Sequence, residues 1–169
     1  GPLNCGGANF VAKEEMGRMR GYGWSQDESH IAFTEVDESP VEVITRSEIY
    51  ADEIKTIEQR YPSAGTPNVA VRLAIYDVAN QSREWVDLGK EQDMYFARGD
   101  WMNNSQVFTY QWQNRSQQML ELRAYDLDSK TQKVLLKEQS DTWVNLHDDL
   151  RFLDDNKHFV WASERDGYK

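Results

Sequence analysis

The sequence has a single cysteine, Cys5, and therefore cannot form an internal disulfide. It has no apolar run near the roughly 18 residues that a membrane-spanning helix needs, and no signal peptide is recognisable at its start. Positive charge is also scarce, because 19 Lys and Arg residues face 29 Asp and Glu residues, giving a formal net charge of −10. This balance argues against a DNA- or RNA-binding surface and is compatible with cationic ligands.

The usual catalytic motifs are missing as well. There is no Gly-x-Ser-x-Gly nucleophile elbow and no Gly-rich phosphate loop. The three histidines, His30, His147 and His158, do not have the spacing of metal ligands. We therefore expect no catalytic residue in this chain, no metal site and no cofactor.

What the sequence does contain is a repeat, in which an aromatic residue is followed by a polar turn and an alternating strand. Its three copies begin at Trp24, Trp101 and Phe152, with aromatics at the first and tenth positions and an apolar residue at the eighth. Asp or Asn stands fourth, where its side chain can bond to the backbone of a turn. The eighth and tenth side chains are two positions apart and so face one side of a strand.

A second repeat interleaves with the first. Residues 73–78 and 122–127 each begin with Leu and end with Tyr-Asp followed by one apolar residue, and the copies lie 49 residues apart. The second and third aromatic motifs are 51 residues apart. A period near 50 residues with about four short strands is typical of a β-propeller blade. A complete β-sandwich would also use alternating strands, but it fits the near-constant period less well.

The repeats predict an all-β fold: a partial β-propeller of roughly three blades with a short helical insertion near the N-terminus. The expected divisions are a helix-bearing insertion at 1–23, a blade at 24–100 with an extended excursion at 36–67, a blade at 101–149 and the start of the next at 150–169. Because the chain stops inside a predicted strand, we expect it to be a fragment of a longer protein.

The segment before the first repeat breaks the strand pattern. Four apolar residues are spaced loosely as one face of a short helix: Phe10, Val11, Met16 and Met19. This helix is expected to last about two turns and to stop near Gly17. The adjacent carboxylates of Glu14 and Glu15 could clamp one ammonium group. The alternative is an ordinary solvated pair, because acidic pairs are common in this chain.

Five short segments stand in a fixed order along most of the chain: Phe-Val-Ala-Lys-Glu-Glu-Met at 10–16, Gly-Tyr-Gly-Trp-Ser at 21–25, Ile-Ala-Phe at 31–33, Asp-Glu-Ser-Pro-Val at 37–41, and Tyr-Pro-Ser-Ala-Gly at 61–65 with Asn68 beyond. In this combination the sequence resembles the propeller domain of the dipeptidyl peptidase IV family of serine peptidases. The spaced combination is much more specific than any one of the motifs.

The resemblance implies an eight-bladed propeller that covers a C-terminal α/β-hydrolase domain, with the active site between them. It also implies that Glu14 and Glu15 bind the free α-ammonium of a peptide, from which X-Pro or X-Ala dipeptides are released. The catalytic serine, aspartate and histidine would then lie outside these residues. Trp143, Asn145 and His147 fall in a loop that lines a substrate pocket in relatives. The Trp and His of this loop are expected to be exposed, as a binding rim would need, although a plain inter-blade loop is the alternative.

Two positions depart from the family pattern. Gly23-Trp24 replaces two adjacent Trp residues, and Gly17 stands where bacterial members often carry Asp; both glycines are expected to add flexibility near the helix.

The resemblance further implies partners and a location: peptides with a free N-terminus, the protein's own hydrolase domain, a second copy in a homodimer, and export to the periplasm or cell surface. The alternatives are a non-catalytic propeller that binds proteins or peptides and an adhesion-type relative with a degraded triad.

Overall fold

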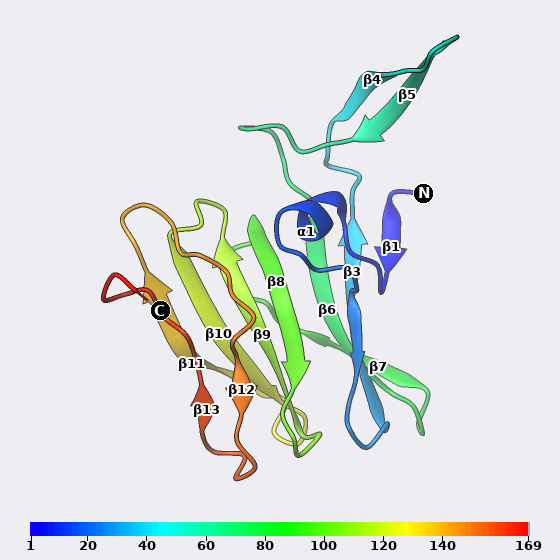
Figure 1. Cartoon of the computed structure of the whole chain (residues 1–169). Helices are drawn as coiled ribbons and strands as arrows, with labels where there is room; N and C mark the ends of the chain where they lie inside the picture. The colour runs from blue at the N-terminus through cyan, green and yellow to red at the C-terminus, as the bar shows by residue number, and fades with distance from the viewer. Residues whose placement is uncertain (169) are drawn as a thin grey trace.

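The computed structural model describes residues 1–168, which form two antiparallel sheets side by side, a projecting hairpin and a short helix (Figure 1). The first sheet has the order β1-β3-β6-β7, and β2 also pairs with β3. Its strands are β1 (Leu3–Cys5), β2 (Tyr22–Trp24), β3 (His30–Asp37), β6 (Ala70–Asp77) and β7 (Ser82–Val86). The predicted all-β class is confirmed. No helix in residues 1–168 is long and apolar enough to cross a membrane.

The second sheet is a four-stranded meander with the order β11-β10-β9-β8. Its strands are β8 (Met94–Trp101), β9 (Val107–Asn114), β10 (Met119–Asp126) and β11 (Thr131–Gln139), and the pair β12 (Arg151–Phe152) and β13 (Phe159–Val160) follows. This sheet starts at Met94 and not at the expected boundary of 101. The reason is that the aromatic residue opening each repeat, such as Trp101, is the last residue of one strand and the turn comes after it.

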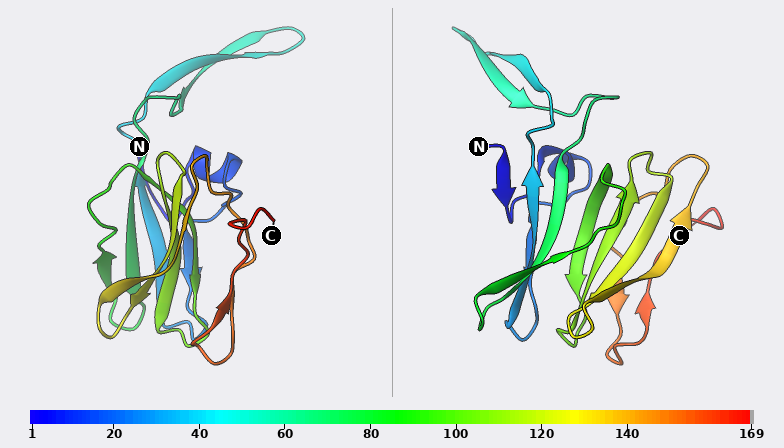
Figure 2. Two further views of the ribbon diagram at one scale, coloured as in Figure 1. Left: turned by 90° about the vertical axis from the view of Figure 1, so that its left-hand side faces the viewer. Right: turned by 180° about the vertical axis from the view of Figure 1, so that it is seen from behind.

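The excursion expected at 36–67 is a two-stranded hairpin that projects away from both sheets (Figure 2). It consists of β4 (Val43–Ile49) and β5 (Ile54–Arg60), so the excursion is itself built of two strands. Arg60 fixes the base of the hairpin, because its Nη1 donates to the carbonyl oxygens of Glu38 (3.1 Å) and Val41 (2.7 Å).

The helix α1 (Phe10–Glu14) lies in the loop between β1 and β2, at one edge of the first sheet. Both β1 and β2 pair with the same edge of β3, and Thr34 lies at the gap between them. The Gly6 amide donates to the Thr34 carbonyl (2.8 Å), and the Thr34 amide donates to the Gly21 carbonyl (2.7 Å). A Cβ on Gly21 would lie 2.6 Å from the Gly7 carbonyl oxygen, so only glycine fits where the loop closes.

The helix is shorter than the two turns expected, with five residues. Ala12 and Met16 are buried, but Met19 is 67% exposed and does not share their face. The cause is Gly17, whose φ of +65° lies in the left-handed region and turns the chain out of the helix. The expected helix end near Gly17 is therefore correct, and the expected apolar face is too long.

The core between the two sheets combines aliphatic side chains with a group of large aromatic ones. Six aromatic side chains that are at most 5% exposed belong to one apolar cluster with residues of the first sheet: Phe96, Trp101, Phe108, Tyr110, Trp112 and Tyr125. Strand β9 is buried along nearly its whole length, so both of its faces are covered. Aromatic rings bury much apolar area each, and this contact therefore joins the sheets into one body.

Candidate functional site

The two glutamates of the sequence motif lie together at the end of α1. Glu14 is the last helical residue and Glu15 follows it as the C-cap, with its amide bonded to the carbonyl of Val11 at 2.9 Å. Both side chains are exposed, whereas Ala12 and Met16 on either side of the pair are buried. The helix therefore presents two adjacent carboxylates that a cation can reach.

The chain reverses directly after this pair. Gly17 adopts its left-handed conformation, and the Arg18 amide donates to the Ala12 carbonyl at 2.8 Å. Asp tolerates this backbone region better than most residues, so the glycine keeps the turn that an Asp at the same position would make. At Gly23 a Cβ would meet nothing within 4 Å, so the absent Trp leaves open space there.

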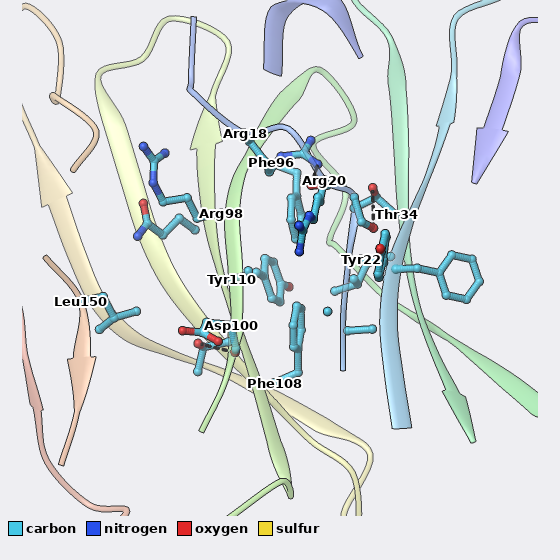
Figure 3. A pocket seen from close by; sticks show the side chains of 18 of the residues that line it. Arg18, Arg20, Tyr22, Thr34, Phe96, Arg98, Asp100, Phe108, Tyr110 and Leu150 are labelled. Carbon is cyan, nitrogen blue, oxygen red and sulfur yellow. Dashed lines mark hydrogen bonds between the residues drawn. The ribbon is translucent and has the colours of Figure 1, made fainter. Parts of the chain in front are cut away.

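Below this turn lies a cavity of about 460 Å³ (Figure 3). It is lined by residues 17–23, by strands β3, β8 and β9, and by Asp148 and Leu150 from the loop before β12. Neither Glu14 nor Glu15 is among the described lining residues, but the lining begins only two positions after Glu15, at Gly17. Arg98 forms an ion pair with Asp148 across one side of the cavity.

Arg18 is the most unusual group in this lining. Its Nη1 donates to the Arg20 carbonyl at 3.0 Å, and its guanidinium carbon lies 5.3 Å from the centre of the Phe96 ring. Its Nε and Nη2 are buried without an acceptor among the described residues. Burial and the nearby charge of Arg98 lower the pKa of Arg18 to about 10, so it stays protonated at neutral pH.

The loop residues predicted for a substrate pocket lie elsewhere. Trp143 is 60% exposed and its Nε1 donates to Asn145 Oδ1 (3.0 Å), while Asn145 Nδ2 donates to Glu164 Oε2 (2.6 Å). His147 was expected to be exposed and is only 7% exposed, because Trp161 packs edge-on against it with ring centroids 4.3 Å apart. The expected exposure of this histidine was wrong.

Trp143, Asn145 and His147 line a second cavity of about 520 Å³, which shares no described lining residue with the first. The structure therefore does not bring them together with the glutamate pair in one cavity.

Sequence reasoning missed Arg18, Arg98 and Asp148. The only signal available for them was a pair of arginines, at 18 and 20, just after two glutamates in an otherwise acidic chain. Among residues 1–168, no three His, Cys, Asp or Glu side chains gather as metal ligands would.

Successive antiparallel sheets of four or five strands, built from one repeat of about 50 residues, are typical of a β-propeller. Comparison with known families agrees with this class. The model for the dipeptidyl peptidase IV (DPP IV) N-terminal region matches residues 2–169, and the chain belongs to that family. The resemblance found in the sequence motifs is thereby confirmed.

Individual proteins with similar sequences or structures are named as dipeptidyl peptidases. Venom dipeptidyl peptidase 4 of Apis mellifera is 26% identical over 159 residues, which cover 84% of this chain and 20% of that protein. Dipeptidyl peptidase 8 of Mus musculus is 26% identical over 209 residues, covering 96% and 23%. The crystal structure of Porphyromonas gingivalis dipeptidyl peptidase 4 superposes with a TM-score of 0.87 at 27% identity, covering 98% of this chain and 24% of that one. The chain thus spans between a fifth and a quarter of these relatives.

Proposed function

We propose that this chain is the substrate-selecting segment of a serine-type dipeptidyl peptidase, in which Glu14 and Glu15 bind the α-ammonium group of a peptide. The observation that carries the proposal is the exposed carboxylate pair on a helix looped out of the first sheet, in a member of the DPP IV N-terminal family. Paired carboxylates hold a protonated amine by charge-assisted hydrogen bonds. A blocked or internal amide cannot satisfy them, so only free N-termini are selected.

In this proposal the segment chooses the substrate and another part of the protein performs the chemistry. The serine nucleophile belongs to an α/β-hydrolase domain, which cleaves after the second residue of peptides that begin X-Pro or X-Ala. The same reading proposes a homodimer and export from the cytoplasm. Trp143 and Asn145, which are exposed, are candidates to contact the substrate, and buried His147 supports their loop from inside.

The test uses the full-length protein that contains this chain. Glu14→Ala and Glu15→Ala are each expected to lower kcat/KM for dipeptide release by roughly a hundredfold, because one carboxylate of a charged pair is lost. Labelling of the serine nucleophile by a phosphonate should persist, which shows that the catalytic domain is intact. Asp52→Ala, in the acidic pair at the tip of the β4–β5 hairpin, is the matched control and should release dipeptides normally.

Unchanged dipeptide release in both glutamate variants would refute the assignment of the pair. A wild-type protein that takes no phosphonate label and releases no dipeptide, yet binds peptides, would instead support the non-catalytic propeller.

A further inference from the structure

The residues that line the cavity below α1 begin at Gly17, two positions after the glutamate pair. The segment 17–21 leaves the end of the helix, crosses the upper end of the cavity and returns to the sheet at Gly21. Figure 3 shows Arg18 and Arg20 at this end, beside the Phe96 ring. Since consecutive Cα atoms are about 3.8 Å apart, the Cα atoms of Glu15 and Arg18 are within roughly 11 Å of each other. Because glutamate and arginine side chains each extend several bonds from their Cα atoms, a carboxylate of the pair and the Arg18 guanidinium can contact the two charged ends of one amino acid.

Arg18 brings an uncompensated positive charge to this place. Two of its guanidinium nitrogens are buried and have no acceptor in residues 1–168, and the neighbouring charge that acts on it is another cation, Arg98. A buried charged donor without a partner costs free energy, so such donors usually face a ligand or an opposite charge. Arg20 adds a second, exposed guanidinium to the same lining.

The carboxylates of the cavity are engaged at other places. Asp148 pairs with Arg98, and Asp100 accepts a hydrogen bond from the Trp101 amide at 2.8 Å. Figure 3 places Asp100 at the far end of the cavity from Arg18. The end crossed by residues 17–21, which follow the glutamate pair in sequence, is therefore cationic, in a chain with a formal net charge of −10.

We propose that Arg18, with Arg20 beside it, makes this end of the cavity a subsite for a carboxylate on the side chain of the peptide's first residue. The inference rests on the proposed function, because Glu14 and Glu15 hold the α-ammonium of that same residue. A Glu or Asp at the N-terminus would then be bound at two points of opposite charge. A fork of guanidinium N–H groups is well suited to a carboxylate, whose two oxygens both accept. The full-length enzyme would favour peptides that begin with an acidic residue followed by proline.

The experiment compares two p-nitroanilide substrates of the same shape, Glu-Pro and Gln-Pro, with the full-length protein. The wild type is expected to show a kcat/KM for Glu-Pro about tenfold or more above that for Gln-Pro, as charge-assisted hydrogen bonds require. Arg18→Met keeps an apolar stem over Phe96 and should bring this ratio close to one. Arg20→Gln should lower the ratio in part. Arg46→Gln, on the β4 strand of the projecting hairpin, is the control and should keep the wild-type ratio.

The outcomes separate this inference from the proposed function. Equal release from both substrates by the wild type, or an unchanged ratio in Arg18→Met, would overturn the carboxylate subsite and leave the glutamate pair in place. Release from neither substrate by the wild type would overturn both proposals. If Arg18→Met fails to fold, Arg20→Gln decides: a wild-type ratio in that variant contradicts the subsite. A preference for Glu-Pro that all arginine variants retain would show that the carboxylate is bound elsewhere.

Discussion

The turn after β2 is held by a single carboxylate, Asp27. Its Oδ1 accepts hydrogen bonds from the Ser25 hydroxyl (2.6 Å), the Ser29 hydroxyl (2.7 Å) and the Ser29 amide (3.1 Å). The bonds from Ser25 and then from Ser29 hold the pKa of Asp27 far below its ordinary range, since they favour the charged form. Asp27 is the fourth position of the aromatic repeat, and these hydrogen bonds explain why Asp suits that position.

Asp27→Ala is expected to lower the thermal unfolding midpoint most at neutral pH. Because the folded-state pKa is depressed, the stabilisation is complete above the unfolded pKa of about 3.9 and is lost as the pH falls below it. The difference in midpoint between wild type and variant should therefore be constant from pH 7 to 5 and shrink by pH 3. Asp52→Ala, at the hairpin tip, should show little difference. A gap for Asp27→Ala that widens toward pH 3 would contradict the role given to this carboxylate.

At the scale of elements, the helix insertion depends on the closure at its base. Gly21→Ala is expected to destabilise the protein by about 1–3 kcal/mol, because the new Cβ would meet the Thr34 hydroxyl at 2.5 Å and the Gly7 carbonyl at 2.6 Å. Gly23→Ala is the matched control, since a Cβ there meets nothing within 4 Å. Thermal unfolding measures both. A Gly21→Ala protein as stable as Gly23→Ala would show that the closure is not tight.

The strands of the repeats could be predicted because their signals are local. Alternation of side chains and an Asp or Asn turn lie within ten residues of sequence. The structure places strands at all three copies of the aromatic repeat and at both copies of the second repeat. Strand β8 was not recognised from Met94 onward. A register shift between Phe96 and Arg98 interrupts its pairing with β9, and a bulge of this kind removes the two-residue period on which the sequence prediction relied.

The site was predictable to a similar degree. The motif placed Glu14 and Glu15 on a short helix, because helix spacing and a terminating glycine are also local signals. His147 was misjudged, since the ring that buries it, Trp161, belongs to a later part of the chain and only tertiary contact joins them. Arg18 was missed because its sequence neighbours suggest a surface residue. A cation just after two glutamates is typical of a solvated surface, and only the turn at Gly17 carries it inward.

At the scale of the whole molecule, successive sheets are linked turn to turn. Trp101 Nε1 donates to the Gly23 carbonyl (3.0 Å), and the Asp27 amide donates to Ser105 Oγ (3.0 Å). The next step repeats this pattern, with Asn103 Nδ2 reaching the Leu153 carbonyl at 3.4 Å. Each aromatic motif thus contacts the following one, in addition to the aromatic core between the sheets.

Trp101→Phe should weaken the contact between the two sheets. Phenylalanine keeps packing against Phe108 but cannot donate to the partly buried Gly23 carbonyl, and the loss of such a hydrogen bond costs about 1 kcal/mol. The thermal midpoint should fall by several degrees. Trp143→Phe, at a side chain that is 60% exposed, should leave it nearly unchanged. Equal effects of the two substitutions would mean that the link contributes nothing.

The way in which Gly6 and Gly21 meet at Thr34 has a consequence for how this protein can change over time. Cys5 pairs with Glu35 and Tyr22 pairs with Phe33, so only Thr34 of β3 lies between the two paired segments. The residues between Gly6 and Gly21 therefore do not affect the pairing register of β3. Insertions, deletions and substitutions in that loop need not propagate into the sheet. The helix with its glutamates, and the arginines after it, can therefore diversify from one descendant to the next while the propeller itself is inherited intact.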